Sequence, residues 1–149
     1  MKETGFERLF SIPLPPSSEK IQDGFSHEIE AQAALISSPE LIFSERKPTF
    51  PSFTIDGAHS KDLDDAIGVE RDGNGFVIHV SIADVSDIVF KDSSIDKEAA
   101  KRSFTEYYGD TRNKPMIPRI LSEDKLSLHE DQLRPTITTS IPISKNGSV

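Results

Sequence analysis

Four aspartates lie within ten residues of this sequence, at Asp56, Asp62, Asp64 and Asp65. Carboxylates this close together repel one another through the Coulomb interaction between like charges. A divalent cation among them offsets the repulsion, and Mg²⁺ binds chiefly to carboxylate and water oxygens. The spacing therefore predicts a metal site, and bound divalent metals are well suited to phosphodiester hydrolysis because they stabilise both the attacking and the leaving oxygen.

The flanking segments predict the scaffold that would hold these side chains. Residues 53–55 lead into the acidic stretch and residues 66–69 lead out of it, and both are rich in strand-forming residues. The acids are therefore expected on a loop between two strands, where rigid elements can fix ligands in place.

Two other interpretations of this acidic loop are a solvated turn and a calcium site. Aspartate is common in turns, so a solvated loop without a ligand remains open. A calcium loop disagrees with the spacing. Asp62 and Asp64 fit its first positions, but Ala66 stands at the fifth and Gly73 stands where the bidentate glutamate belongs.

The acidic loop also carries a family resemblance. Thr54-Ile55-Asp56, followed by Lys61-Asp62-Leu63-Asp64-Asp65-Ala66, resembles the signature of the RNB domain, the catalytic domain of ribonuclease II and ribonuclease R. Further segments that resemble the family are residues 23–31, 79–85, 94–107, 115–118 and 121–128. The resemblance extends over roughly residues 20–149.

The resemblance implies an α+β fold, the N-terminal portion of an RNB-type catalytic domain, with a mixed sheet and a metal-binding acidic loop. It also implies a hydrolytic 3′→5′ exoribonuclease that uses Mg²⁺ or Mn²⁺ and releases nucleoside 5′-monophosphates from single-stranded RNA. By the same resemblance, Asp56, Asp62, Asp64 and Asp65 would hold the metal. Asp64 would be the acid whose loss most damages catalysis.

Tyr107 falls where the family places an aromatic side chain against the terminal nucleotide. Tyr108 and Gly109 depart from the Phe-Pro-like pair that usually follows, so which tyrosine takes this role stays open. Residues 101–125 carry six basic and four acidic side chains, so this stretch is +2 whereas the rest of the chain is −10. Aromatic side chains beside cationic ones are typical of sites for single-stranded nucleic acid.

Composition sets broader limits on the class of protein. A chain of 149 residues, 35 % of them hydrophobic, is long enough for one globular domain. No apolar run approaches the ~18 residues of a membrane span, and the absence of cysteine excludes disulfides and cysteine nucleophiles. The net charge of −8 argues against a protein that coats nucleic acid by phosphate contacts alone. We expect a cytoplasmic chain without a membrane partner.

The remaining polar candidates receive no catalytic role. His59 is tempting as a base, but an exposed loop histidine is the favoured interpretation. His79 and Asp84 belong to a predicted strand and its end, where local hydrogen bonds explain them. Lys61 lowers the charge of the acidic loop, and Arg134 matches a family position without an assigned role.

The expected elements follow from periodicity and capping signals. Residues 1–20 are rich in proline and serine and are predicted to be a tail or linker, and residues 21–149 a partial RNB-like domain. The expected elements are a helix over 25–36 capped by Asp23, a hairpin of 67–69 with 76–82, a helix capped by Ser94 that buries Ile95, Ala99 and Phe104, and a strand over 137–143.

The sequence ends soon after a turn signal. Lys145-Asn146-Gly147 predicts a hairpin turn, yet only two residues follow it. An unpaired edge strand is usually avoided, so we expect the front part of a larger domain, completed by a missing C-terminal half or a further chain. The isolated chain is then expected to be weak or inactive. A non-catalytic metal- or RNA-binding module and a general Mg²⁺-dependent phosphohydrolase are the alternatives.

Overall fold

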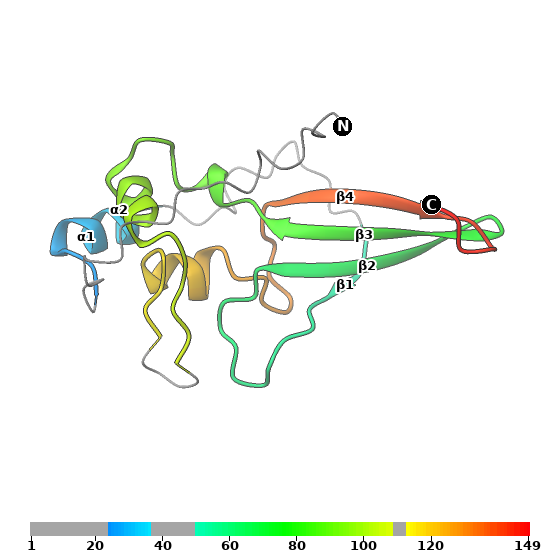
Figure 1. Cartoon of the computed structure of the whole chain (residues 1–149), viewed down its shortest axis with the longest axis horizontal. Helices are drawn as coiled ribbons and strands as arrows, with labels where there is room; N and C mark the ends of the chain where they lie inside the picture. Colours follow the sequence, from blue (N-terminus) through cyan, green and yellow to red (C-terminus); the bar gives the residue numbers. More distant parts are fainter. Residues whose placement is uncertain (1–23, 37–49, 109–112) are drawn as a thin grey trace, which may run out of the picture.

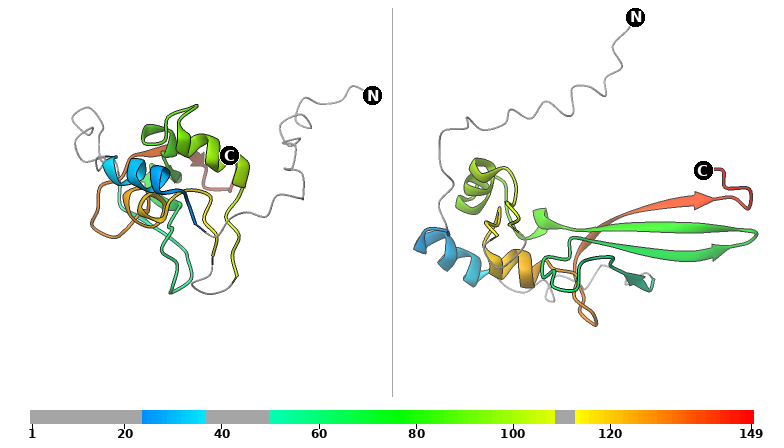
Figure 2. Two further views of the ribbon diagram at one scale, coloured as in Figure 1. Left: turned by 90° about the vertical axis from the view of Figure 1, so that its left-hand side faces the viewer. Right: turned by 60° about the horizontal axis from the view of Figure 1, so that its bottom comes forward.

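The structure is a computed structural model that describes residues 24–36, 50–108 and 113–149. A four-stranded sheet extends from a group of short helices gathered at one of its ends, as Figures 1 and 2 both show. The predicted tail over residues 1–20 lies outside the described residues.

The sheet contains β1 (Ser52–Phe53), β2 (Asp65–Asp72), β3 (Gly75–Ala83) and β4 (Thr136–Ile143), side by side in that order. The α+β class is confirmed. Each of the three described pairings is antiparallel, so the sheet in this part of the chain is not the mixed sheet that we expected.

The predicted hairpin is confirmed between β2 and β3, with Asp72 paired to Gly75. Gly73 in its turn has φ of +54°, a left-handed conformation that costs glycine little. The predicted strand at 137–143 is confirmed as β4, which lies at the edge of the sheet.

The two faces of the sheet differ in chemistry and in burial. The larger apolar side chains share one face, because alternate residues of a strand point to the same side, but this face is open to solvent. Val69, Phe76, Ile82 and Ile137 expose 52 %, 44 %, 56 % and 63 % of their surface, and we call these four residues the apolar sheet face. The opposite, polar face is better covered, and His79 and Ser81 on it are buried.

An aromatic ring covers part of the polar face. Phe50 stacks on the imidazole of His79, with ring centroids 3.9 Å apart and an interplanar angle of 14°. Gly68 leaves room for this ring, because a Cβ at that position would overlap the Phe50 side chain and lie 3.1 Å from the Pro51 carbonyl oxygen. A glycine in a strand often marks such a close approach.

Gly68→Ala is therefore expected to displace Phe50 and to lower the free energy of unfolding by about 1–3 kcal/mol, the usual range for overpacking. Urea denaturation of both proteins measures the difference. Gly57→Ala is the matched control, because its added Cβ meets only Ser60 Oγ at an ordinary 3.5 Å. Equal effects of the two substitutions would contradict the role given to Gly68.

The helices enclose a small core. The elements are α1 (His27–Leu35), a 3₁₀ turn (Val85–Asp87), α2 (Ser94–Arg102) and a π-helical turn (Leu121–Lys125). The buried apolar residues among them and around them are Ile29, Ala33, Ala83, Ile88, Val89, Ile95, Leu121 and Leu126.

The predicted helix caps need correction. Ser26 caps α1, accepting the Ile29 N–H at 3.3 Å, whereas the predicted cap Asp23 lies outside the described residues. Ser93 rather than Ser94 caps α2 and accepts the Asp96 N–H at 3.1 Å. Phe104 was expected to be buried, but α2 ends at Arg102 and the Phe104 side chain is exposed.

A lysine from a distant segment completes α1. Lys125 is buried, and its Nζ donates to the carbonyl oxygens of Ala33 at 3.1 Å, Ala34 at 3.2 Å and Ile36. The last carbonyls of a helix lack partners within it and carry partial negative charge, so a buried ammonium is favourable there. Lys125 thereby joins the π-helical turn to α1.

Candidate metal centre

The four aspartates lie where the sequence placed them, between β1 and β2. Asp56, Asp62 and Asp64 belong to the connecting loop, and Asp65 is the first residue of β2, paired with Ile82. The strand before the loop ends earlier than expected, at Phe53. Residues 54–64 therefore form the acidic loop, defined here by its position between the two strands.

The electrostatics of the acidic loop are perturbed at Asp64. Asp64 is exposed, yet partial desolvation of its carboxyl is the first cause that raises its pKa above the ordinary 3.8, followed by the negative charges of Asp62, Asp65 and Asp56. Asp64 thus stands in the field of all three other acids, and a bound cation would relieve this repulsion.

The four aspartates suit a metal ion by the type of their ligand atoms more than by the positions of their side chains. Carboxylate oxygens are the ligands that hard cations such as Mg²⁺ and Mn²⁺ prefer. Within the ranges that the structure describes, however, no three His, Cys, Asp or Glu side chains are grouped closely enough to hold an ion. The donor set fits a hard divalent cation, but the carboxylates are not gathered around one point.

The backbone of the acidic loop is held from two sides. On one side, Ala83 at the end of β3 donates its N–H to the Asp64 carbonyl oxygen at 2.9 Å. On the other side, Ser127 and Leu128 bond the backbone of Lys61 and Leu63. Ser127 belongs to a segment that resembled the family, but no local pattern in the sequence marked its hydroxyl as a contact of this loop.

Tyr107 meets the acids directly. Its hydroxyl donates to Asp62 Oδ2 at 2.5 Å, across 45 positions of sequence, and its ring remains largely exposed. Tyr108 makes other contacts, since its hydroxyl donates to Glu106 and its N–H to Asn113 Oδ1. The structure therefore places Tyr107, not Tyr108, against the acidic loop.

The contact with Asp62 is expected to appear in the titration of Tyr107. The hydrogen bond to Asp62, followed by partial burial and the charges of Asp62 and Asp64, raises the pKa of Tyr107 to about 12. Because this pKa lies above the usual 10.0, the stability from the neutral hydroxyl is present below pH 10.0 and is lost as pH rises through about 12. Ultraviolet absorbance should show a late tyrosine transition.

The chain suits this measurement because it has two tyrosines and no tryptophan. Tyr107→Phe should remove the transition at about pH 12, and Tyr108→Phe should leave it in place. Retention of the late transition in Tyr107→Phe would contradict the contact with Asp62.

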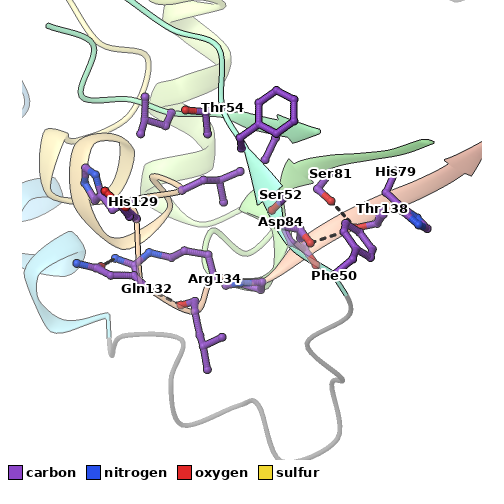
Figure 3. Close-up of a pocket in the computed structure, with 18 of the residues that line it drawn as sticks. Phe50, Ser52, Thr54, His79, Ser81, Asp84, His129, Gln132, Arg134 and Thr138 are labelled. Atoms are coloured by element: carbon purple, nitrogen blue, oxygen red, sulfur yellow. Dashed lines mark hydrogen bonds between the residues drawn. The ribbon is translucent and has the colours of Figure 1, made fainter. Parts of the chain in front are cut away.

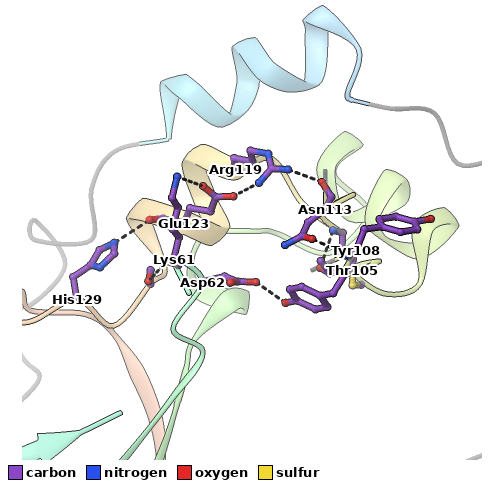
Figure 4. A network of polar contacts seen from close by, with 11 residues as sticks. Lys61, Asp62, Thr105, Tyr108, Asn113, Arg119, Glu123 and His129 are labelled. Carbon is purple, nitrogen blue, oxygen red and sulfur yellow. Dashed lines mark hydrogen bonds and ion pairs between the residues drawn. The ribbon is translucent and has the colours of Figure 1, made fainter. Parts of the chain in front are cut away.

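A second set of polar contacts links the acidic loop to the segment after the tyrosines. Lys61 Nζ lies 4.0 Å from Glu123 Oε2, and Arg119 pairs with Glu123 and donates to the Asn113 carbonyl oxygen (Figure 4). Lys61 is 71 % exposed, so its pair with Glu123 contributes little stability. The Lys61 side chain is thus directed toward the 119–123 segment.

Two of the other polar residues, His79 and Asp84, have structural partners. His79 bonds Ser140 Oγ at 2.8 Å and Glu70 Oε2 at 3.2 Å, and Asp84 accepts from Ser86 at 2.7 Å. His59 is exposed in the acidic loop. These three residues therefore keep the non-catalytic interpretation that the sequence favoured.

A pocket lies over the polar face of the sheet, beside the acidic loop. Phe50, His79, Ser81, Asp84 and Arg134 are among the residues that line it (Figure 3). None of the four aspartates lines this pocket, and neither does Tyr107; only Leu63 does so from the 61–65 stretch. The pocket and the candidate metal centre are thus adjacent but separate.

Comparisons with known proteins agree on one relationship. The RNB domain family model matches residues 47–149. The chain is 46 % identical over 97 residues to Exoribonuclease 2 of Aeromonas hydrophila. The aligned residues make up 65 % of this chain and 14 % of that relative. The chain is 42 % identical over 114 residues to Exoribonuclease 2 of Psychromonas ingrahamii, with 76 % and 17 % covered.

The fold is similar to solved structures of RNase R from Mycoplasma genitalium. The structure in complex with double-stranded RNA matches with a TM-score of 0.76 and 32 % identity, over 84 % of this chain and 23 % of that chain. The apo form matches with a TM-score of 0.75 over 20 % of its length. The chain thus spans less than a quarter of each of these similar proteins. In the part that the structure describes, no helix is long and apolar enough to cross a membrane.

Proposed function

The chain belongs to the RNB domain family, and from this premise we propose that it is the front part of a hydrolytic 3′→5′ exoribonuclease that releases nucleoside 5′-monophosphates. The observation that carries the proposal is the bond between Tyr107 and Asp62. It brings an exposed aromatic ring, suited to stack on a base, against carboxylates suited to hold a cation beside the phosphate.

In this proposal Asp56, Asp62, Asp64 and Asp65 hold Mg²⁺ or Mn²⁺. When bound, such a cation supplies charge neutralisation at the phosphate and lowers the pKa of a coordinated water. Desolvation and the neighbouring carboxylates raise the pKa of Asp64, and in this proposal its carboxylate holds the cation or its water. Tyr107 orients the 3′-terminal nucleotide of a single-stranded RNA over these carboxylates.

We further propose that more RNB polypeptide, in the same chain or in another, completes the domain. The apolar sheet face is open to solvent, and contiguous exposed apolar surface usually marks an interaction site. β4 pairs with β3 on one side only within the described residues, so it offers an edge for another strand. Residues 21–149 form the partial domain of this proposal, residues 1–20 its linker, and its site of action is the cytoplasm without a membrane partner.

Cleavage of a 5′-labelled single-stranded RNA tests the proposed activity. A working site in the purified chain would produce, with Mg²⁺ or Mn²⁺, a ladder that shortens from the 3′ end, with nucleoside 5′-monophosphates as products. A chain that needs the rest of the domain would be weak or inactive in the same assay. A circular RNA of the same sequence is the control, because it offers no 3′ end and should remain intact. Cleavage of the circle would contradict exonucleolytic action, and hydrolysis of free nucleotides alone would favour a general phosphohydrolase.

The second candidate is a non-catalytic metal- or RNA-binding module. The observation that favours it is the open arrangement of the carboxylates, together with the small share of the relatives that the chain spans. A folded chain that binds Mn²⁺ and RNA but cleaves neither linear nor circular RNA would support this candidate and contradict independent catalysis.

A further inference from the structure

We propose that Ser127 is a positioning residue for the candidate metal centre, because its hydroxyl fixes the backbone that presents Asp62 and Asp64. The inference rests on the proposed function of these two aspartates. Ser127 itself touches neither RNA nor a cation. It acts through the peptide groups on both sides of Asp62.

The hydroxyl of Ser127 bridges two backbone groups of the acidic loop. Ser127 Oγ accepts the Leu63 N–H at 3.0 Å and donates to the Lys61 carbonyl oxygen at 2.7 Å. Ser127 is 1 % exposed, so water does not replace these bonds readily. A single side chain thereby fixes the peptide groups immediately before and after Asp62.

The neighbouring backbone reinforces this contact. Leu128 donates its N–H to the Leu63 carbonyl oxygen at 2.9 Å, so residues 127–128 bond both the N–H and the carbonyl of Leu63. Ala83 fixes the Asp64 carbonyl from the sheet. Leu63 is thus the anchored residue between two candidate ligands, and the direction of both carboxylates depends on its backbone.

Ser127 is in turn rigidly placed. Arg134, whose side chain is 6 % exposed, donates from Nε to the Ser127 carbonyl oxygen and from Nη2 to the Asp124 carbonyl oxygen, both at 3.1 Å. Lys125, two positions before Ser127, is fixed to the end of α1. The position of Ser127 is therefore fixed by contacts outside the acidic loop, which is what a positioning residue requires.

Loss of the hydroxyl would leave the Leu63 N–H and the Lys61 carbonyl without their partner. A buried unpaired group is costly, so the loop is expected to shift toward water rather than keep its backbone in place. Groups that orient metal ligands typically contribute 10–100-fold to metal affinity. Ser127→Ala is accordingly expected to weaken Mn²⁺ binding about 10-fold.

The test uses the full chain and measures Mn²⁺ affinity by electron paramagnetic resonance, with urea unfolding and amide hydrogen exchange of the acidic loop in parallel. Ser81→Ala is the matched control. Ser81 is also buried, at 5 %, and loses a comparable hydroxyl contact, to Thr138 Oγ1 at 2.9 Å. Ser81→Ala should lower stability but change the Mn²⁺ dissociation constant less than about twofold, and only Ser127→Ala should speed exchange at Leu63.

The outcomes separate this inference from the proposed function. Equal Mn²⁺ affinity in Ser127→Ala and the unmodified chain overturns the positioning role and leaves the proposed function intact. No Mn²⁺ binding by the unmodified chain overturns both. Should Ser127→Ala fail to fold, Ser127→Cys is the second variant, because it keeps a similar shape with a weaker hydrogen-bonding group. Ser127→Cys should show a smaller loss of Mn²⁺ affinity. An unchanged Mn²⁺ affinity in Ser127→Cys overturns the inference equally.

Discussion

Asp64→Asn is expected to abolish RNA cleavage by this chain, or by a larger protein that contains it, and at the same time to make the fold more stable. Removal of one electrostatic stabiliser of a transition state commonly costs ~10²-fold or more in rate. The gain in stability has a separate cause. Burial and the charges of Asp62, Asp65 and Asp56 disfavour the ionised carboxylate of Asp64 and raise its pKa.

The sign of the pH dependence follows from this shift. Because the pKa of Asp64 in the folded state lies above its ordinary 3.8, the ionised carboxylate destabilises the fold at neutral pH. As pH falls through the folded-state pKa, the carboxyl becomes neutral and this cost disappears. Asp64→Asn should therefore have the higher melting temperature at neutral pH, and the two proteins should converge below pH 3.8.

Asp72→Asn is the control for this prediction. Asp72 lies at the opposite end of β2 from the acidic loop, so its substitution removes the same charge without relieving the cluster. RNA cleavage should be unchanged in Asp72→Asn, and its melting temperature should lack the pH-dependent gain. A lower stability of Asp64→Asn at neutral pH, or undiminished cleavage, would contradict the interpretation of Asp64.

Local patterns were sufficient to predict several elements. The β2–β3 hairpin follows from alternating apolar residues around Gly73, and the position of the acids follows from their place between two apolar segments. The start of α2 was predicted within one residue. Ser93 and Ser94 are both competent caps, and a local pattern does not distinguish them; in the structure Ser93 is the cap and Ile95 lies in the core.

Contacts between distant segments could not be predicted. The hydroxyl of Ser127 meets Leu63 across 64 positions, and Lys125 meets Ala33 across 92. The partner of a buried serine or lysine cannot be predicted from its residue type, because such a side chain bonds whichever backbone groups the fold brings to it. The same holds for Arg134, which matched a family position without a role and is now seen to hold the segment that fixes the acidic loop.

Which face of the sheet is buried is a third feature that the sequence could not predict. Alternation along β2 and β3 showed which side chains share a face, but it could not show which face is covered. The polar face is covered because Phe50 lies over it on Gly68, whereas the apolar sheet face has no cover within the described residues. An amphipathic strand usually buries its apolar face, so the exposure here supports the proposal that further polypeptide completes the domain.

Arg102→Ala is expected to have the largest effect on folding. Arg102 is 2 % exposed, and its guanidinium lies 3.8 Å from the ring centroid of Phe25. It pairs with Glu98 at 3.1 Å, donates to the Pro115 carbonyl oxygen at 3.3 Å and donates to the Gly24 carbonyl oxygen. Arg102 thus joins α2 to the segment before α1 and to the segment after the tyrosines.

Removal of this side chain leaves two backbone carbonyls without their donor and takes a cation from the face of Phe25. Loss of one partner from a buried charged network commonly costs about 3–5 kcal/mol, a large fraction of the 5–15 kcal/mol typical of a whole domain. We expect Arg102→Ala to unfold largely at 37 °C, with loss of near-ultraviolet circular dichroism and a urea midpoint far below that of the unmodified chain.

Lys101→Ala provides the matched control, because Lys101 also pairs with Glu98, at 3.6 Å, but its side chain is 71 % exposed. An exposed pair contributes about 0–1 kcal/mol, so this substitution should shift the urea midpoint only slightly. The comparison separates the burial of a cation from its charge, since both variants remove one positive partner of the same glutamate. If the two variants unfolded at the same urea concentration, the stability would come from the charge of the helix and not from the buried contacts of Arg102.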